Sequence, residues 1–391
     1  MTIRAKRAAL SLLVGISAGL AAALFLFLLA WVTALREAQP QIIWFLPFAG
    51  LFIGLIYHLY GKDVAAGHNL ILDEIHAPKS QVPLRMAPFV LFGTLATHLF
   101  GGSAGREGTA VQMSAAIADQ IATLFKTTVE DRKVLLTAGL AAGFGAATGA
   151  PIAGAIFGME VLRRGKFKWF AGMECFIASF VGYCVTRLVH APHTHYSAVQ
   201  SIDYQLKTIG AALLLGLFSG LACRFFVRCT HFIEFTFARF IKWPPLKPFL
   251  AGLLLVILYQ LEGSYQYVGL GLPVIQTSFI QTSPWQTPLL KCLFTALTLG
   301  SGFKGGEFIP LVFIGATMGS ALSGVLQVST ALLAALGFVS VFAGAANTPI
   351  ACSILAMELF GPQIGGYALI VCFLSSVCSP LSFTRSGNIK P

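Results

Sequence analysis

The sequence predicts an all-α integral membrane protein built from two similar halves. The chain of 391 residues is 56% hydrophobic and only 10% charged, a composition that requires lipid rather than water around most of its surface. The chain also repeats itself, because many residues recur 198 positions later. Its 40 glycines and 18 prolines interrupt the apolar stretches, which predicts tilted and broken helices instead of a simple bundle.

The repeat defines two membrane halves, which we expect to be residues 1–198 and 199–391 of one transmembrane domain. The pairs at this offset are Gly102-Ser103 with Gly300-Ser301, Arg106 with Lys304, Gly108 with Gly306, 151–153 with 349–351, and Met159-Glu160 with Met357-Glu358. Repeats of this size in a hydrophobic chain are typical of transporters, whose binding sites lie where broken helices of both halves meet.

The apolar stretches predict eight or nine helical segments in each half. They are 8–32, 41–59, 86–100, 208–227, 249–261, 331–360 and 367–383. A span of the hydrocarbon core needs roughly 20 residues, so some of these stretches are long enough and others are not. The first stretch resembles a signal peptide, but it is too long and no clear cleavage site follows, so we interpret it as a span.

The net charge of +11 predicts orientation and a class of substrate. Arg4, Lys6 and Arg7 precede the first span and predict a cytoplasmic N-terminus in a multi-pass membrane protein. The basic loop 163–168 is predicted on the same side. The remaining positive charge favours attraction of an anion. Nucleic acid is not expected as a partner, because the basic residues form no continuous face.

Cysteines and histidines predict neither disulfides nor a metal site. The eight cysteines lie scattered in apolar segments without CxxC spacing. The cluster of His190, His193 and His195 is interpreted as an inter-helix loop rather than a metal ligand set. An intramembrane enzyme is the alternative from another class, but HExxH and GxSxG are absent and Ser103 has no candidate base except His98. We therefore expect no enzymatic activity and no cofactor.

Glu107 is the charged residue that most needs a functional explanation, since a charge within a span is costly. It follows Gly105-Arg106 and precedes the apolar run 110–124, so it is placed at a helix N-terminus. The free N–H groups of a helix start bind anions. A tethered carboxylate there competes with a free anion, and protonation removes the competitor. The alternative is that Glu107 only pairs with Arg106 and caps the helix, although adjacent side chains on a helix do not face each other.

The related loop of the second half predicts a matching helix start. Gly306-Glu307-Phe308-Ile309-Pro310 precedes the apolar run 311–326, and Pro310 suits a first helical turn. The two helix starts are expected to converge near the middle of the membrane. A carboxylate beside an anion site repels the ion unless it is protonated or hydrogen-bonded, so Glu307 is either part of the site or a solvated cap.

Three further acidic or polar positions have a structural explanation. In Gly67-His68-Asn69, Asn69 is a candidate N-cap with acids in the first turn of the helix, and its amide is a candidate donor to the same site. Glu160 and Glu358 are interpreted as helix-terminal residues that face a loop or the interface between the halves.

These loops and the two halves resemble the CLC family of chloride channels and chloride/proton antiporters over essentially the whole chain. The segment 105–108 (GREG) is similar to the loop with the family's external gating glutamate, and 306–310 to its G-x-F-x-P loop, whose amides contact the central anion. Ala150-Pro151 and Thr348-Pro349 match the paired helix starts that follow. The resemblance implies inverted-topology repeats, a homodimer, and a separate anion pathway in each subunit.

Departures from the chloride-type pattern resemble the branch that exchanges fluoride for protons. Thr109 replaces a proline, the first loop has Asn69 and lacks the chloride-coordinating serine, and Glu307 stands where an apolar residue is usual. Val161 stands where chloride/proton antiporters have an internal proton-transfer glutamate, which the fluoride branch also lacks. The family closes the inner side of the site with a tyrosine near its C-terminus. No tyrosine follows Tyr367 here, and Tyr367 lies too early in the last span for that role. Either the end of the chain, 386–391, is altered or another residue supplies the inner contact.

The resulting hypothesis is a fluoride/proton antiporter that exports fluoride as protons enter, with membrane lipid as its surroundings. Fluoride is strongly hydrated, so its site needs short hydrogen bonds from hard donors. Glu107 is the expected gate and proton carrier. The expected anion site consists of His68, Asn69, Gly105, Arg106, Gly108, Thr109, Gly306, Glu307, Phe308 and Ile309. A chloride/proton antiporter or chloride channel of the same fold is the main alternative.

Overall fold

The computed structural model describes residues 3–162, 169–196, 199 and 205–379. Within these ranges the chain forms sixteen α-helices and three short 3₁₀ helices, and no β-strand. The all-α prediction is therefore confirmed, and eight α-helices fall in each half, at the lower of the two numbers expected. The basic loop 163–168 and the C-terminal segment 386–391 lie outside the described residues.

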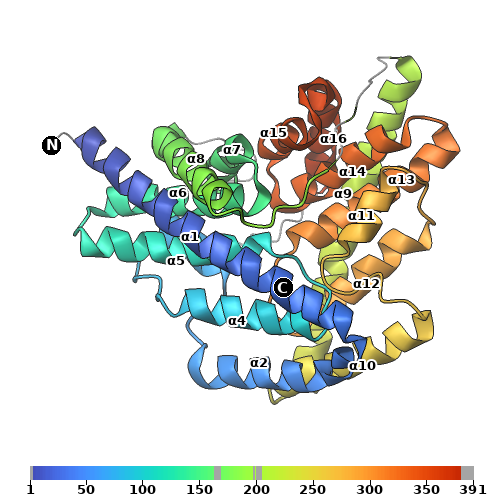
Figure 1. Ribbon diagram of the computed structural model, residues 1–391, viewed down its shortest axis with the longest axis horizontal. Helices are drawn as coiled ribbons and strands as arrows, with labels where there is room; N and C mark the ends of the chain where they lie inside the picture. Colours follow the sequence, from blue (N-terminus) through green and yellow to red (C-terminus); the bar gives the residue numbers. More distant parts are fainter. Residues whose placement is uncertain (1–2, 163–168, 197–198, 200–204, 380–391) are drawn as a thin grey trace.

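Each helix of the first half has a counterpart in the second at close to the repeat offset. The first half contains α1 (Ile3–Ala38), η1 (Pro40–Phe45), α2 (Leu46–Tyr60), α3 (His68–His76), α4 (Met86–Leu99), α5 (Glu107–Leu124), α6 (Val129–Thr148), α7 (Pro151–Glu160), η2 (Trp169–Ala171) and α8 (Gly172–Leu188). The second contains α9 (Leu206–Phe240), α10 (Leu246–Glu262), α11 (Leu272–Ser278), α12 (Gln286–Gly300), α13 (Phe308–Leu326), α14 (Thr330–Ala346), α15 (Pro349–Phe360), η3 (Pro362–Ile364) and α16 (Gly365–Cys378). In Figure 1 most of the first half, blue to green, lies on the left, and most of the second, yellow to red, on the right.

Helix lengths agree with a membrane protein of tilted and broken helices. In the part of the chain that the structure describes, four segments are long and apolar enough to cross a membrane: 4–38, 40–60, 206–240 and 308–326. With 36 and 35 residues, α1 and α9 are each about 50 Å long, well above the roughly 30 Å hydrocarbon core, so both must tilt if they cross it. In contrast, α3 has nine residues and α11 seven, too few to span.

The apolar run 331–360 illustrates how the chain breaks a helix. Asn347 takes a left-handed conformation with φ of 54° and ends α14, and Pro349 then begins α15. The first half breaks in the same place, where Gly149 with φ of 75° ends α6 and Pro151 begins α7. A left-handed residue after one helix and a proline in the first turn of the next are the usual stop and start signals.

The two halves cap each other's helices through a pair of glutamates. Glu160, at the end of α7, accepts hydrogen bonds from the backbone N–H groups of Ile350 and Ala351 at the start of α15, at 3.0 and 2.7 Å. Glu358 of α15 does the same for Ile152 and Ala153 of α7, also at 3.0 and 2.7 Å. The interpretation of both glutamates as residues of the interface is confirmed, because each satisfies N–H groups that a helix start leaves free.

The cysteines are unpaired, and the contacts of His193 and Ser103 are those of structural residues. All eight cysteines are free. His193 bonds through Nε2 to the carbonyl oxygen of Ala146 at 2.8 Å, and over the ranges the structure describes no three His, Cys, Asp or Glu residues are grouped as metal ligands. Ser103 Oγ lies 2.9 Å from Thr295 Oγ1, so the hydroxyl is not paired with His98 as a nucleophile would be with its base.

Candidate anion site at the junction of the two halves

The glycine-rich loops of the two halves are joined directly to each other. Gly105 and Gly306 form an antiparallel pair: the N–H of Gly105 donates to Gly306 O at 2.6 Å, and the N–H of Gly306 donates to Gly105 O at 2.8 Å. A Cβ added to Gly306 would lie 2.9 Å from the backbone nitrogen of Gly108, so the loops are close-packed there. The starts of α5 and α13 therefore converge, as the repeat predicted.

Three helix starts around this junction lack a side-chain cap: those of α3, α5 and α13. In contrast, the side chains of Thr128 and Ser329 cap α6 and α14. An uncapped helix start presents free N–H groups and the positive end of the helix dipole, which favour an anion.

A cavity of about 290 Å³ lies where these starts meet. Seven of the predicted site residues line it: His68, Asn69, Glu107, Gly108, Gly306, Glu307 and Phe308. The other four, Gly105, Arg106, Thr109 and Ile309, do not. Sequence alone could not separate the two groups, because consecutive residues of a loop and first turn point in different directions.

Gly67, rather than Asn69, is the N-cap of α3. Gly67 has φ of 56°, a conformation that glycine adopts readily, and the helix begins at His68. Asn69 is the second helical residue, and no acid occupies the first turn, so both expectations for this turn were wrong. Asn69 nevertheless lines the cavity, where its amide can donate to an anion.

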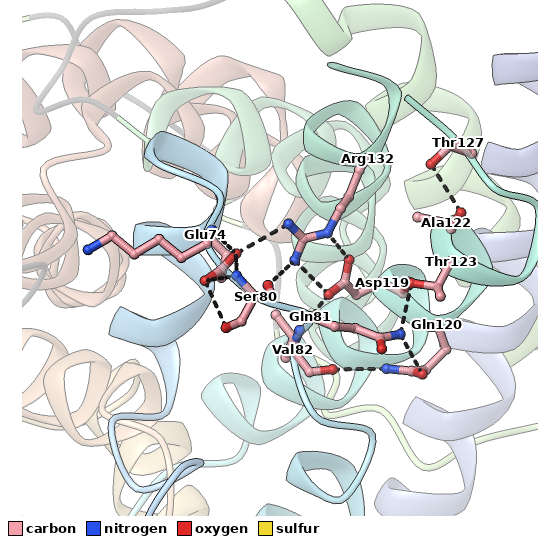
Figure 2. A network of polar contacts seen from close by, with 11 residues as sticks. Glu74, Ser80, Gln81, Val82, Asp119, Gln120, Ala122, Thr123, Thr127 and Arg132 are labelled. Carbon is pink, nitrogen blue, oxygen red and sulfur yellow. Dashed lines mark hydrogen bonds and ion pairs between the residues drawn. The ribbon is translucent and has the colours of Figure 1, made fainter. Parts of the chain in front are cut away.

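The short helix α3 is held in place by Arg132 of α6, as Figure 2 shows. The guanidinium binds Asp119 of α5 at 2.5 and 2.8 Å, Glu74 of α3 at 3.2 Å, and the carbonyl oxygen of Ser80 at 2.7 Å. Asp119 also accepts a hydrogen bond from the N–H of Val82 at 2.6 Å. The largely buried cluster ties the far end of α3 and the following loop to α5 and α6, and so fixes where the α3 start can lie.

Glu107 is the first residue of α5 and is 2% exposed. One carboxylate oxygen lies 3.2 Å from Arg106 Nε, and the other accepts from the Arg106 backbone N–H at 3.3 Å. The expectation that adjacent side chains would not meet was wrong, because Arg106 precedes the helix with φ of −120° and only Glu107 has helical geometry. The carboxylate thus occupies the start of α5 while it also lines the cavity.

The four predicted residues outside the cavity have other contacts. The Arg106 guanidinium pairs with Glu107 and donates to Thr194 Oγ1 at 3.3 Å. Thr109 Oγ1 lies 2.7 Å from Thr94 Oγ1, and this hydrogen bond joins α5 to α4. Gly105 is paired with Gly306, and Ile309 is buried in the hydrophobic core.

Glu307 differs from Glu107 in both position and partners. It precedes α13 as the N-cap residue, lines the cavity and is partly exposed, so it is not a fully solvated cap. Across the part of the chain that the structure describes, no hydrogen bond or ion pair to its carboxylate is found.

Phenylalanines that the sequence did not single out form one wall of the cavity. Phe308 meets Phe342 and Phe144 edge to face, with ring centroids 4.7 and 5.5 Å apart. Phe144 stacks on Phe157 at 4.2 Å. Phe144 and Phe342 stand at the repeat offset, so the repeat was an available signal for both. Ring edges carry positive partial charge, which suits a wall beside an anion.

A tyrosine and a lysine were also missed. Tyr57 and Lys304 both line the cavity, and the Lys304 Nζ lies 4.0 Å from the centre of the Tyr57 ring. Val161, the position of the missing internal glutamate, lines the cavity as well. Tyr367 is buried in α16 and does not, as its early position in the last span implied.

Comparisons with known proteins agree with this geometry. A "Chloride/fluoride channel protein" of Pseudomonas syringae pv. tomato is 48% identical over 382 residues, 96% of this chain and 84% of that protein. The "H(+)/Cl(-) exchange transporter ClcA" of Vibrio cholerae is 27% identical over 90% of this chain and 81% of its own. The crystal structure of a CLC-type fluoride/proton antiporter matches with a TM-score of 0.94 and 33% identity over 98% of both chains.

A second solved structure, of a slow cyanobacterial Cl⁻/H⁺ antiporter, has the same fold. It matches with a TM-score of 0.83 and 21% identity over 97% of this chain and 95% of that one. The family model described as "Voltage gated chloride channel" matches residues 49–380, most of the chain. This protein belongs to the voltage-gated chloride channel (CLC) family.

Proposed function

We propose that this protein is a fluoride/proton antiporter that exports fluoride from the cytoplasm in exchange for protons. The observation that carries the proposal is the position of Glu107. Its carboxylate lies at the uncapped start of α5 and lines the cavity on which the uncapped starts of α3 and α13 also converge. A helix start of this kind binds an anion, and here the anion is part of the chain.

Competition for this position couples the two fluxes. While Glu107 is ionised, its carboxylate fills the helix start and excludes a free anion of the same charge. When it takes up a proton, its attraction to the helix dipole and to Arg106 falls, and the side chain can leave the position to fluoride. Each exchange of the carboxylate for fluoride thus requires a proton to bind or leave.

Fluoride is favoured over chloride by the kind of donors at the cavity and by the relatives. Desolvating fluoride costs more than desolvating chloride, so its site must offer short hydrogen bonds from nitrogen donors. The free N–H groups of the helix starts and the Asn69 amide are such donors, and the Phe308 ring adds a weaker electrostatic contact. The relative that is 48% identical is a chloride/fluoride channel protein, and the structure with a TM-score of 0.94 is that of a CLC-type fluoride/proton antiporter.

Family membership extends the proposal to assembly and orientation. We expect a homodimer with one anion pathway per subunit, in the inner membrane, with the N-terminus in the cytoplasm. Arg7, near the start of α1, pairs with Asp131 of α6 at 2.6 Å. The Arg132 cluster (Figure 2) therefore lies at the same end of the molecule and is expected to face the cytoplasm.

The test is fluoride efflux from proteoliposomes, with fluoride and external pH recorded together. The wild type should move protons in a fixed ratio to fluoride, whereas Glu107→Gln should lose proton movement. Glu130→Gln changes an exposed carboxylate that pairs with Lys133, and should behave as the wild type. If Glu107→Gln still moves protons in step with fluoride, the gating role is wrong.

The same assay decides between fluoride and chloride. An antiporter for chloride, or a chloride channel, would give a chloride flux equal to or larger than the fluoride flux in the wild type. That result would reject fluoride as the main substrate and leave the competition at α5 to be tested with chloride.

A further inference from the structure

Lys304 brings a positive charge to the wall of the cavity. It immediately precedes Gly305-Gly306 of the second loop, lines the cavity and is half-buried. Across the described ranges no carboxylate lies within 4.0 Å of its ammonium, although Glu307 is three residues away. The ammonium lies over the face of the Tyr57 ring, 4.0 Å from the ring centre.

The surroundings of Lys304 fix its side chain toward the cavity. A Cβ added to Gly93 of α4 would lie 2.9 Å from Lys304 Cγ, so a glycine at 93 makes room for the lysine stem. The Tyr57 ring is itself held edge to face against Phe89, with centroids 5.3 Å apart at 80°. A long side chain that passes a glycine and ends on a supported ring has lost most of its freedom to turn away.

Two other cations, Arg106 and Lys291, differ from Lys304 because each has polar partners of its own. Arg106 is neutralised by Glu107 at 3.2 Å and does not line the cavity. Lys291 is fully buried and donates to the carbonyl oxygens of Tyr267 and Gly269 at 3.0 and 2.8 Å. Among the described residues that line the cavity, Lys304 is the one lysine or arginine.

We propose that Lys304, supported by Tyr57, is an affinity-determining residue that draws small anions into the cavity. An ammonium has three N–H donors, and a ring face occupies only one side of it, so donors remain for an anion. A unit charge at the wall of a partly enclosed, low-dielectric cavity raises the local concentration of anions. The inference builds on the proposed anion transport, but it concerns binding of a halide and not its coupling to protons.

Equilibrium binding of fluoride and of chloride to the purified protein, by titration calorimetry in detergent, tests this role. Lys304→Met should weaken binding of the preferred halide on the order of tenfold, as expected for loss of one charge across a cavity of this size. Lys304→Arg keeps the charge and should restore most of the affinity. Lys242→Met removes an exposed lysine beyond the end of α9 and should bind as the wild type.

Tyr57 provides a second pair of variants that leaves the lysine in place. Tyr57→Phe retains the ring and should keep most of the affinity, whereas Tyr57→Leu removes the ring face and should weaken binding severalfold. In flux assays, loss of the charge should raise the fluoride concentration for half-maximal efflux with little change in the proton-to-fluoride ratio.

The outcomes separate the inference from the proposed function. Unchanged binding in Lys304→Met, or equal losses in Lys304→Met and Lys304→Arg, would overturn the role of the charge, and so would a wild type that binds neither halide. Wild-type binding that depends on Lys304, without coupled fluoride efflux, would uphold the inference and reject the antiporter. Dependence on Lys304 seen with chloride alone would uphold the inference and reject fluoride as the substrate.

Discussion

The two glycine-rich loops occupy equivalent places in the repeat but use their charges in opposite ways. In the first loop the cation and the carboxylate neutralise each other, since Arg106 contacts Glu107 at 3.2 Å. In the second loop Lys304 lies against Tyr57, and the side-chain carboxylate of Glu307 has no ion-pair or hydrogen-bond partner among the described residues. The backbone of the two loops is nevertheless joined by the Gly105–Gly306 pair. The first loop thus contains an ion pair, whereas the second contains a lysine and a glutamate that are not paired with each other.

This difference suggests a division of roles. A carboxylate that is paired and seated at a helix start has two alternative states, bound and released, which a gate requires. A lysine and a glutamate that are not paired with each other have no such pair to open and close. They shape the electrostatic potential at the cavity wall for any ion that enters. The first loop is therefore the proposed switch and the second the proposed binding wall, and substitutions matched across the repeat can break this distinction.

The largest expected effect is the contrast between Glu107→Gln and Glu307→Gln. Glu107→Gln should abolish proton movement coupled to fluoride, because an amide cannot exchange a proton in the transport cycle. Glu307→Gln should preserve coupling and instead change the fluoride concentration for half-maximal efflux, because it alters an ionisable group of the cavity wall and leaves the gate in place. The measurement is the proton-to-fluoride ratio in proteoliposomes. Loss of coupling in both variants would mean that both loops act as switches.

The next largest effect is expected from substituting the glycines of the second loop, which should lower the stability of the folded protein. Gly305 has φ of 156°, and a Cβ there would lie 2.5 Å from Ala104 Cβ in the facing loop. Gly305→Ala should therefore cost about 3 kcal/mol or more, from strain and overpacking at the joined loops. Gly302 has φ of 107° but open space around it, so Gly302→Ala should cost only the backbone strain of about 1–2 kcal/mol. The midpoint of thermal aggregation in detergent measures the difference, and equal losses would show that the loops are not tightly joined.

The reciprocal glutamates at the other helix starts should give a smaller, graded effect. Glu160 is fully buried, whereas Glu358 is half-buried, although both accept two backbone hydrogen bonds at the same distances. Glu160→Gln replaces one acceptor by a donor and should cost about 1–3 kcal/mol by leaving a buried N–H unpaired. Glu358→Gln should cost less, because water can replace the lost bond. The same thermal assay checks this order, and a larger loss from Glu358→Gln would contradict it.

The helical architecture could be predicted from the sequence, because the repeat places similar residues at a constant offset. The offset that aligned Pro151 with Pro349 also aligns the breaks at Gly149 and Asn347, and it aligns the glycine-rich loops that lead into the convergent helices α5 and α13. Such backbone features follow from local signals such as proline, glycine and apolar runs.

The contacts of the site were less accessible from sequence, because they depend on the directions of side chains from distant elements. Nothing local indicates that Tyr57 of α2 meets Lys304, or that Arg106 leaves the helix and turns back to Glu107. Phe144 and Phe342 could have been paired by the repeat offset, yet their edge-to-face contacts with Phe308 required the folded structure. The misplaced cap at Asn69 has a similar cause, since Gly67 adopts a positive φ that composition does not reveal.

The smallest expected effect concerns Thr109, which the sequence placed in the anion site and the structure places beside it. Its hydroxyl lies 2.7 Å from Thr94 Oγ1, and the residue does not line the cavity. Thr109→Ala should lower stability by about 0.5–1.5 kcal/mol through loss of this hydrogen bond, and Thr109→Ser should largely keep it. Fluoride affinity should be unchanged in both variants. A Thr109→Ala protein of normal stability with weakened fluoride binding would instead show that this hydroxyl turns toward the anion. Thr109 would then belong to the anion site and not to the contact between α5 and α4.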